Sequence, residues 1–302
     1  ARMHYQIVHH MAALDAAHNP PNSLNAVEAC LAANAAAIEV DIMPLAGEDF
    51  LLVHDDVLES ETTGQGRVSE CTPEAAKKLQ LKQRGGSVVS DQVPALLTEV
   101  VAAMLGAPAR TRLQLDYKAI NPTVDDEWLR RVIRIVEPLG DRVIVSSYAD
   151  WHLRRLRRLA SWLDIGFDIG LYLEWRDPAW QVAPRKPPFH LGSYGYYDDH
   201  VLARQRLLPN AAYLAERCEI LLRQVPEAST WYVSHHLIAR GLDEGFNMAA
   251  WLRENDVKLD AWTMDVDKPV AVANAPRLRD AGVDLFTSNT PLALGQLLQA
   301  QA

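Results

Sequence analysis

Two acidic residues stand inside an apolar segment near the start of the chain. Residues 36–42 read AAIEVDI, a sequence typical of a buried strand, yet the segment carries Glu39 and Asp41. Side chains two residues apart on a strand point to the same side, so we expect these carboxylates to lie together. Buried ionised carboxylates are costly unless cations or hydrogen-bond donors compensate them, and a coordinated metal ion would do so. A structural ion pair with Lys118 or an arginine is the alternative.

Histidines follow two other apolar segments. His9 comes directly after residues 5–8, YQIV, and His54 directly after residues 50–53, FLLV. The ordinary pKa of an imidazole lies near neutrality, so these side chains are suited to accept and donate protons. We predict an acid–base pair beside the acidic strand, with ordinary strand-end histidines as the alternative.

A further strand candidate carries an acid and a cation near its end. Residues 111–118, TRLQLDYK, alternate between apolar and polar side chains, so Gln114, Asp116 and Lys118 should share one face. We predict that Asp116 and Lys118 join the same site, with a plain ion pair between strands as the alternative.

Strands and helices alternate along the chain. The expected strands are residues 5–8, 36–42, 50–53, 111–118, 142–146, 162–171, 231–234, 257–264 and 283–287. The expected helices are residues 24–34, a short one from 72, 93–105, 125–136, 150–161, 242–254, 269–281 and 291–301. About eight such repeats predict an α/β fold of the (β/α)8 TIM-barrel class. The carboxyl ends of barrel strands form the catalytic face, where we expect His9, Glu39, Asp41, His54, Asp116, Lys118 and Asp265 to gather.

One long segment fits no simple strand–helix repeat. Residues 174–208 are rich in aromatic residues and proline. We predict a single barrel domain over residues 1–302 in which this segment is an insertion on the rim, forming a lid or a pocket wall. A surface excursion that packs on a helix or makes a dimer contact is the alternative, so an oligomer is compatible with the sequence.

Composition limits the function classes. The chain has 302 residues, 49% of them hydrophobic and 23% charged, with a net charge of −9 and a pI of about 5.6. This acidic balance argues against a nucleic-acid partner and leaves a small phosphodiester substrate open. Three widely spaced cysteines predict neither a disulfide framework nor a structural zinc site.

No segment has the length of a membrane-spanning helix, and residues 1–10 lack a signal-like apolar stretch. The sequence favours the cytoplasm, with the periplasm or secretion as alternatives if a leader has been removed.

Several motifs occur in the order found in the glycerophosphodiester phosphodiesterase family, which the chain resembles over most of its length. They are IVHH, PNSLNAVEACLAANAAAIEVDI, LLVHDDVLESETTGQGRV, LQLDYK, VSSYADWHLRRLRRLA, LDAWTMD and AGVDLFTSNTP. The most specific part is Glu39-x-Asp41 followed by His54-Asp55.

The resemblance implies roles for individual residues. His9 and His54 would be the general acid–base pair, and Glu39, Asp41 and Asp116 would ligate a divalent cation. Lys118, His10 and Trp262 would contact the phosphate or substrate. The family uses Ca²⁺ or Mg²⁺, which suit an all-oxygen ligand set, to hydrolyse a glycerophosphodiester to glycerol 3-phosphate and an alcohol. The resemblance also favours attack by the glycerol 2-hydroxyl to form a cyclic phosphate, which is then opened.

The chain departs from the family pattern at four places. His9-His10-Met11 stands for His-Arg-Gly, and Pro20-Pro21-Asn22-Ser23 stands for Pro-Glu-Asn-Thr. Asp116 replaces a glutamate, and Asp265 stands where an asparagine is expected after Trp-Thr. These changes leave open which phosphodiester is the substrate. The alternatives to the hydrolase are a phosphodiester lyase that releases a cyclic phosphate from a lipid-like substrate and a catalytically weak binding protein on the same barrel.

Overall fold

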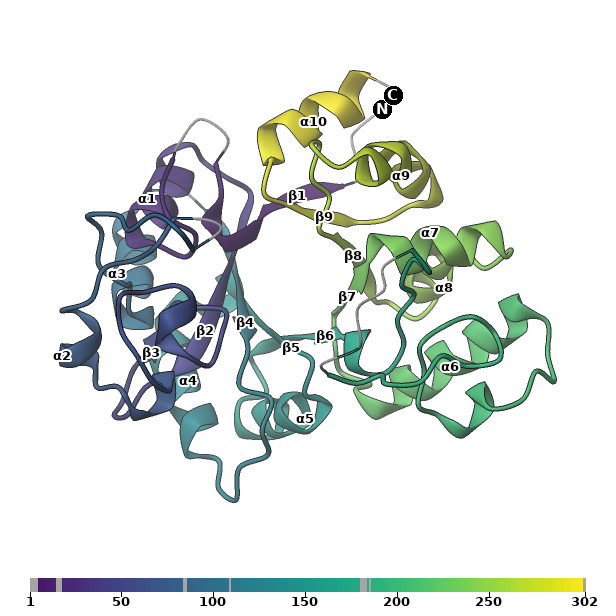
Figure 1. Cartoon of the computed structure of the whole chain (residues 1–302), viewed down its shortest axis with the longest axis horizontal. Helices are drawn as coiled ribbons and strands as arrows, with labels where there is room; N and C mark the ends of the chain where they lie inside the picture. The colour runs from purple at the N-terminus through teal and green to yellow at the C-terminus, as the bar shows by residue number, and fades with distance from the viewer. Residues whose placement is uncertain are drawn as a thin grey trace.

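The computed structural model describes residues 5–14, 18–83, 86–108, 110–179, 184 and 186–300, and within them a closed parallel barrel (Figure 1). Its strands are β1 (Gln6–His9), β2 (Ala37–Pro44), β4 (Arg112–Tyr117), β5 (Val143–Ser147), β6 (Asp164–Asp168), β7 (Thr230–Ser234), β8 (Lys258–Trp262) and β9 (Leu285–Ser288). They pair in the order β1-β9-β8-β7-β6-β5-β4-β2, and β1 pairs with β2 to close the ring. The predicted (β/α)8 class is confirmed.

Helices lie between the strands on the outside of this ring (Figure 1). They are α1 (Leu24–Ala32), α2 (Pro73–Ala76), α3 (Leu97–Gly106), α4 (Glu127–Val136), α5 (Asp150–Leu159), α6 (Asn210–Gln224), α7 (His235–Asp243), α8 (Met248–Arg253), α9 (Pro269–Ala281) and α10 (Pro291–Ala300). Ser23 caps α1 by accepting a hydrogen bond from the Ala26 N–H. Among the described residues, none of the helices combines the length and apolar character needed to cross a membrane.

Strand alternation separates the barrel core from the site. Ile38, Val40 and Ile42 of β2 are buried and belong to the apolar core, whereas Glu39 and Asp41 take the opposite face. The strands β2 and β4 pair so that Asp41 stands beside Asp116. The alternation predicted for residues 111–118 is confirmed, because Gln114, Asp116 and Lys118 line a cavity while the intervening residues pack in the core.

A short antiparallel strand, β3 (Phe50–Leu51), pairs with the end of β2. Residues 50–53 are all buried, so this apolar segment holds the chain against the barrel up to His54. The following loop returns over the carboxyl end of β2, which is why an acidic strand and a histidine 13 residues beyond Asp41 reach one site.

Two helical predictions need correction. The helix predicted over residues 242–254 is two helices, α7 and α8, because Gly245 has a φ of +86° between them. The helix α7 begins at His235, directly after β7, where the sequence analysis placed no helix. The helix α6 was also missed.

The segment predicted as an insertion connects β6 with α6. It contains short turns and isolated bridges, in which Tyr197 pairs with both Glu174 and Leu191. Residues 180–183 and 185 lie outside the described residues. The description as a single domain with a rim insertion at 174–208 stays a prediction.

Candidate active site

Three carboxylates meet at the carboxyl ends of β2 and β4. Glu39, Asp41 and Asp116 each offer an oxygen, and these oxygens lie within 4.8 Å of one another. Glu39 and Asp41 are buried, and Asp116 is half-buried. Three acids this close repel one another, so the arrangement needs positive charge among them.

Part of that charge comes from Lys118. Its ammonium nitrogen lies 3.1 Å from Asp41 Oδ1 and 2.5 Å from Asp116 Oδ2. Burial opposes the charged form of Lys118, but Asp116 and Asp41 hold its pKa well above the ordinary value. The sequence analysis gave ion pairs with Lys118 as the alternatives for Asp41 and for Asp116. Both ion pairs are present as contacts within the site.

One lysine leaves the cluster with excess negative charge. Burial, followed by the charges of Asp41 and Asp116, raises the pKa of Glu39 well above its ordinary value. Burial also opposes ionisation of Asp41, yet Lys118, followed by the nearby His54 and His10, keeps the pKa of Asp41 below its ordinary value. Among the described residues, Asp41 Oδ1 has no hydrogen-bond partner, although it lies near Lys118.

This donor set fits a hard divalent cation. All three side chains supply oxygen, which Ca²⁺ and Mg²⁺ prefer, and Lys118 alone does not balance the charge of three carboxylates. Other contacts hold the carboxylates in place. The Met11 N–H donates to Glu39 Oε2 at 2.8 Å, and Asn22 donates its side-chain N–H to Asp41 Oδ2 at 2.9 Å.

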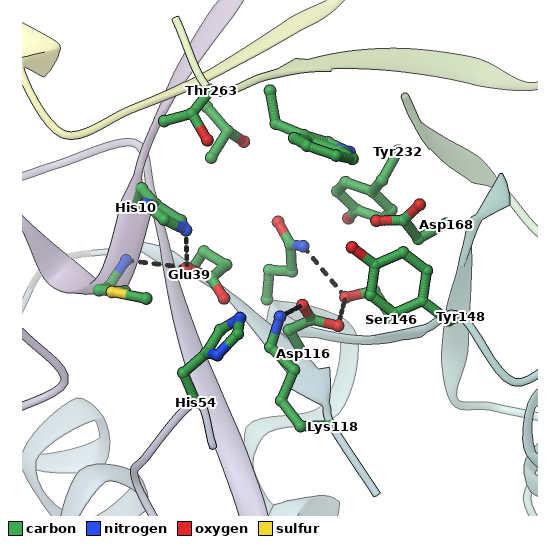
Figure 2. A pocket seen from close by; sticks show the side chains of 14 residues that line it. His10, Glu39, His54, Asp116, Lys118, Ser146, Tyr148, Asp168, Tyr232 and Thr263 are labelled. Carbon is green, nitrogen blue, oxygen red and sulfur yellow. Dashed lines mark hydrogen bonds and ion pairs between the residues drawn. The ribbon is translucent and has the colours of Figure 1, made fainter. Parts of the chain in front are cut away.

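His10 stands over the carboxylates at the end of β1 (Figure 2). Its Nε2 lies 3.8 Å from Glu39 Oε2, and its Nδ1 contacts Asn289 Oδ1 at 2.8 Å. Both N–H groups of Asn289, from the backbone and the side chain, donate to Asp265 at 2.8 Å, which orients the amide oxygen toward His10. Nδ1 therefore carries the hydrogen, and Nε2 is the atom that faces the site.

His54 enters the same cavity from the loop after β3. Its Nδ1 donates to Asp55 Oδ1 at 2.8 Å, so the other ring nitrogen is left for the cavity. The backbone N–H groups of His54 and Asp55 both donate to Glu61 Oε2, at 2.6 and 3.1 Å. The Glu61 carboxylate, at the other end of the loop, therefore holds His54 in place.

His9 lies elsewhere, contrary to its predicted place in the site. Its side chain is buried, its Nδ1 donates to the Ala13 carbonyl at 2.7 Å, and it does not line the cavity. The reason is the two-residue period of β1: Gln6, Val8 and His10 face inward, and His9 faces the opposite side. The geometry gives His10 the position that the sequence analysis assigned to His9.

The cavity has a volume of about 180 Å³ and a second wall opposite the acids (Figure 2). Residues of β5, β6, β7 and β8, or directly after these strands, form this wall. They include Ser146, Tyr148, Asp168, Tyr232, Trp262 and Thr263. Trp262 lines the cavity, and its contact with the substrate stays a prediction.

Asp168 is the acid on this second wall. Burial, then the charge of Asp116, raises the pKa of Asp168 to about 8, although the Gly170 N–H donates to its Oδ1 at 2.8 Å. The sequence analysis missed Tyr148 and Asp168. Tyr148 lies two residues past the expected strand 142–146, and Asp168 lies inside the expected strand 162–171, so neither stood at a predicted strand end. Asn289, in the motif TSNTP, lies two residues past the expected strand 283–287 and was missed as well.

Comparisons with known proteins bear on this geometry. A sequence model of the Glycerophosphoryl diester phosphodiesterase family matches residues 15–293. The chain is similar to a glycerophosphodiester phosphodiesterase from Caldanaerobacter subterraneus subsp. tengcongensis, with 24% identity over 178 residues, covering 58% of this chain and 73% of the relative.

Solved structures share the fold. A glycerophosphodiester phosphodiesterase from Parabacteroides distasonis has a TM-score of 0.66 and 15% identity, with 100% of this chain and 99% of that one covered. A phosphodiesterase from Oleispira antarctica, in complex with the product sn-glycerol 3-phosphate, has a TM-score of 0.65 and 14% identity, with 97% and 96% covered.

Proposed function

The chain belongs to the glycerophosphoryl diester phosphodiesterase family, and we propose that it hydrolyses a glycerophosphodiester to glycerol 3-phosphate and an alcohol. One observation carries the proposal. Three carboxylates, Lys118 and two histidines converge on a single cavity at the carboxyl face of the barrel. Phosphodiester cleavage needs cations at the phosphoryl oxygens and two proton transfers, and this set of residues can supply both.

Glu39, Asp41 and Asp116 would hold the divalent cation, Ca²⁺ or Mg²⁺. When bound, such an ion polarises the phosphoryl group and offsets the charge that develops on its oxygens. Lys118 adds a fixed positive charge beside Asp41 and Asp116. The Met11 and Asn22 contacts keep the carboxylates oriented without help from the substrate.

His10 and His54 would be the acid–base pair, in place of the predicted His9 and His54. Each has its Nδ1 bonded to an acceptor, Asn289 or Asp55, so each presents Nε2 to the phosphate. One accepts the proton of the attacking group, which is the glycerol 2-hydroxyl or a water molecule, and the other donates a proton to the departing alkoxide. After attack by the 2-hydroxyl, a water molecule opens the resulting cyclic phosphate to glycerol 3-phosphate. Because Asp265, Asn289 and His10 are joined by hydrogen bonds, His10 would meet the phosphate in one tautomer and one orientation.

Phosphorus NMR of the products tests this proposal. We expect the native protein to convert glycerophosphodiesters of choline, ethanolamine, inositol or glycerol to glycerol 3-phosphate with Ca²⁺ or Mg²⁺, and not in chelator. The Asp41→Asn variant, which keeps the size of the side chain, should lose this response to the ion. Failure of the native protein to consume any diester in the series would contradict the proposal. A cyclic phosphate that accumulates without opening would instead identify a lyase.

A further inference from the structure

The segment 174–208 is fixed to the outside of the barrel by a buried ion pair. Asp198 is paired with Arg217 of α6, and both side chains are buried. The hydroxyl of Tyr213, also on α6, donates to Asp198 Oδ2 at 2.6 Å. Removing one partner of a buried pair leaves an uncompensated charge, so this contact holds the segment firmly against α6.

Aromatic contacts hold the rest of the segment. Tyr194 stacks on Tyr213 with the ring centroids 3.8 Å apart and the planes 9° from parallel. The hydroxyl of Tyr196 donates to Glu244 at 2.7 Å, and the backbone of Tyr197 pairs with Glu174. The described part of the segment is therefore attached at Glu174 and at residues 194–198.

One such side chain reaches the active-site wall. The ammonium nitrogen of Lys186 lies 3.9 Å from the centroid of the Tyr148 ring, and that ring lines the cavity. The ammonium nitrogen of Lys118 lies 5.8 Å from the same centroid. Tyr148 is thus in contact with two cations, one within the site and one from segment 174–208.

The charge on the second wall decides which substituent can lie there. Tyr148 and Asp168 lie across the cavity from His10 and Glu39 (Figure 2), so an ester arm of a phosphate bound beside the carboxylates has room on this side. The charged groups that act on Lys186 are the acids Asp168, Glu174 and Asp116 and the cation Lys118. Of these acids, Glu174 is already paired with Arg176 and Asp116 with Lys118. Lys186 therefore adds positive potential to the region where that arm ends.

We propose that Lys186 is a specificity-determining residue, which disfavours a cationic leaving group such as choline and favours a neutral or anionic alcohol. The assignment rests on the proposed function, and it gives segment 174–208 a role in choosing the leaving alcohol. It acts through charge, since the Lys186 side chain contacts the wall and does not itself line the cavity.

The test is the ratio of kcat/KM for glycerophosphoinositol to kcat/KM for glycerophosphocholine. We expect Lys186→Met to shift the ratio toward choline by about 5- to 30-fold, from one charge roughly 8 Å away at an effective dielectric constant of about 20 to 40. Lys186→Glu should shift it further in the same direction. Both shifts should shrink at high salt, which a purely structural role would not produce.

Lys268 provides the matched control. It is an exposed lysine after β8, paired with Asp267 at 3.0 Å, and Lys268→Met should leave the ratio unchanged. An unchanged ratio in both Lys186 variants, with turnover retained, would overturn the assignment and leave the proposed function standing. Absence of turnover of every diester by the native protein would overturn both.

Discussion

A carboxyl group buried beneath the active site makes a quantitative prediction about stability. Asp260 lies on β8, two residues before Trp262, and has no exposed surface. Its Oδ2 accepts a hydrogen bond from the Thr287 hydroxyl at 2.9 Å, and its Oδ1 has no hydrogen-bond partner among the described residues. Burial raises the pKa of Asp260 from 3.8 to about 7, and the Thr287 hydrogen bond only partly opposes this rise.

The direction of the pH dependence follows from whether the folded or the unfolded protein holds the proton on Asp260. Between about pH 4 and pH 7 the folded protein keeps a proton on Asp260 that the unfolded chain has released, so stability falls as pH rises. Above the folded pKa of about 7 the loss is complete. A rise of the pKa from 3.8 to about 7 corresponds to a loss of about 4 kcal/mol, at about 1.4 kcal/mol per pH unit.

Asp260→Asn removes the titration and keeps an oxygen for Thr287. Relative to the native protein, we expect the unfolding free energy of this variant to rise by about 4 kcal/mol between pH 4 and pH 8. Urea unfolding followed by tryptophan fluorescence at each pH measures the difference, in which the titrations common to both proteins cancel. Thr287→Val, which removes the opposing hydrogen bond, should raise the pKa of folded Asp260 further, so the fall in stability should continue to a higher pH. A difference that stays constant with pH would refute the reasoning.

Two further predictions concern the site. His10→Ala and His54→Ala should each lower kcat by at least about 100-fold in a folded protein. His9→Ala should mainly lower the unfolding free energy. If a folded His9→Ala variant lost kcat to a comparable degree, the sequence prediction for His9 would be restored. Gly166→Ala places a Cβ 2.4 Å from Tyr232 Cε2, so we expect a loss of about 1–3 kcal/mol in urea unfolding, and an unchanged midpoint would show that Tyr232 can move aside.

The barrel and the acidic cluster could be predicted because local pattern determines them. Glu39 and Asp41 interrupt a fully apolar strand, and residues 111–118 alternate cleanly, so the inward faces of β2 and β4 follow from the strand period. The pairing of Asp41 with Asp116 then brings the acids together.

Which residues of β1 face the inside of the barrel could not be predicted in this way. Tyr5, Ile7 and His9 alternate with Gln6, Val8 and His10, and each set contains both apolar and polar residues. The inward set is decided by the pairing of β1 with β2 and β9, which is a tertiary property. Met11, with a φ of +51°, then turns the chain so that its N–H reaches Glu39.

The second wall depends on long-range packing even more strongly. Tyr148 and Asp168 lie at the ends of different strands, and Lys186 reaches Tyr148 from a segment whose Asp198 and Tyr194 pack on α6. Sequence position alone places none of these contacts.

A crystal structure with Mn²⁺ and glycerol 3-phosphate tests the central claim most directly, since Mn²⁺ shares the oxygen ligands of Mg²⁺ and scatters anomalously. We predict an anomalous peak among the carboxylates of Glu39, Asp41 and Asp116, with the phosphate between His10 and His54. An ion bound away from these carboxylates, or a phosphate contacted by His9 in place of His10, would contradict the account.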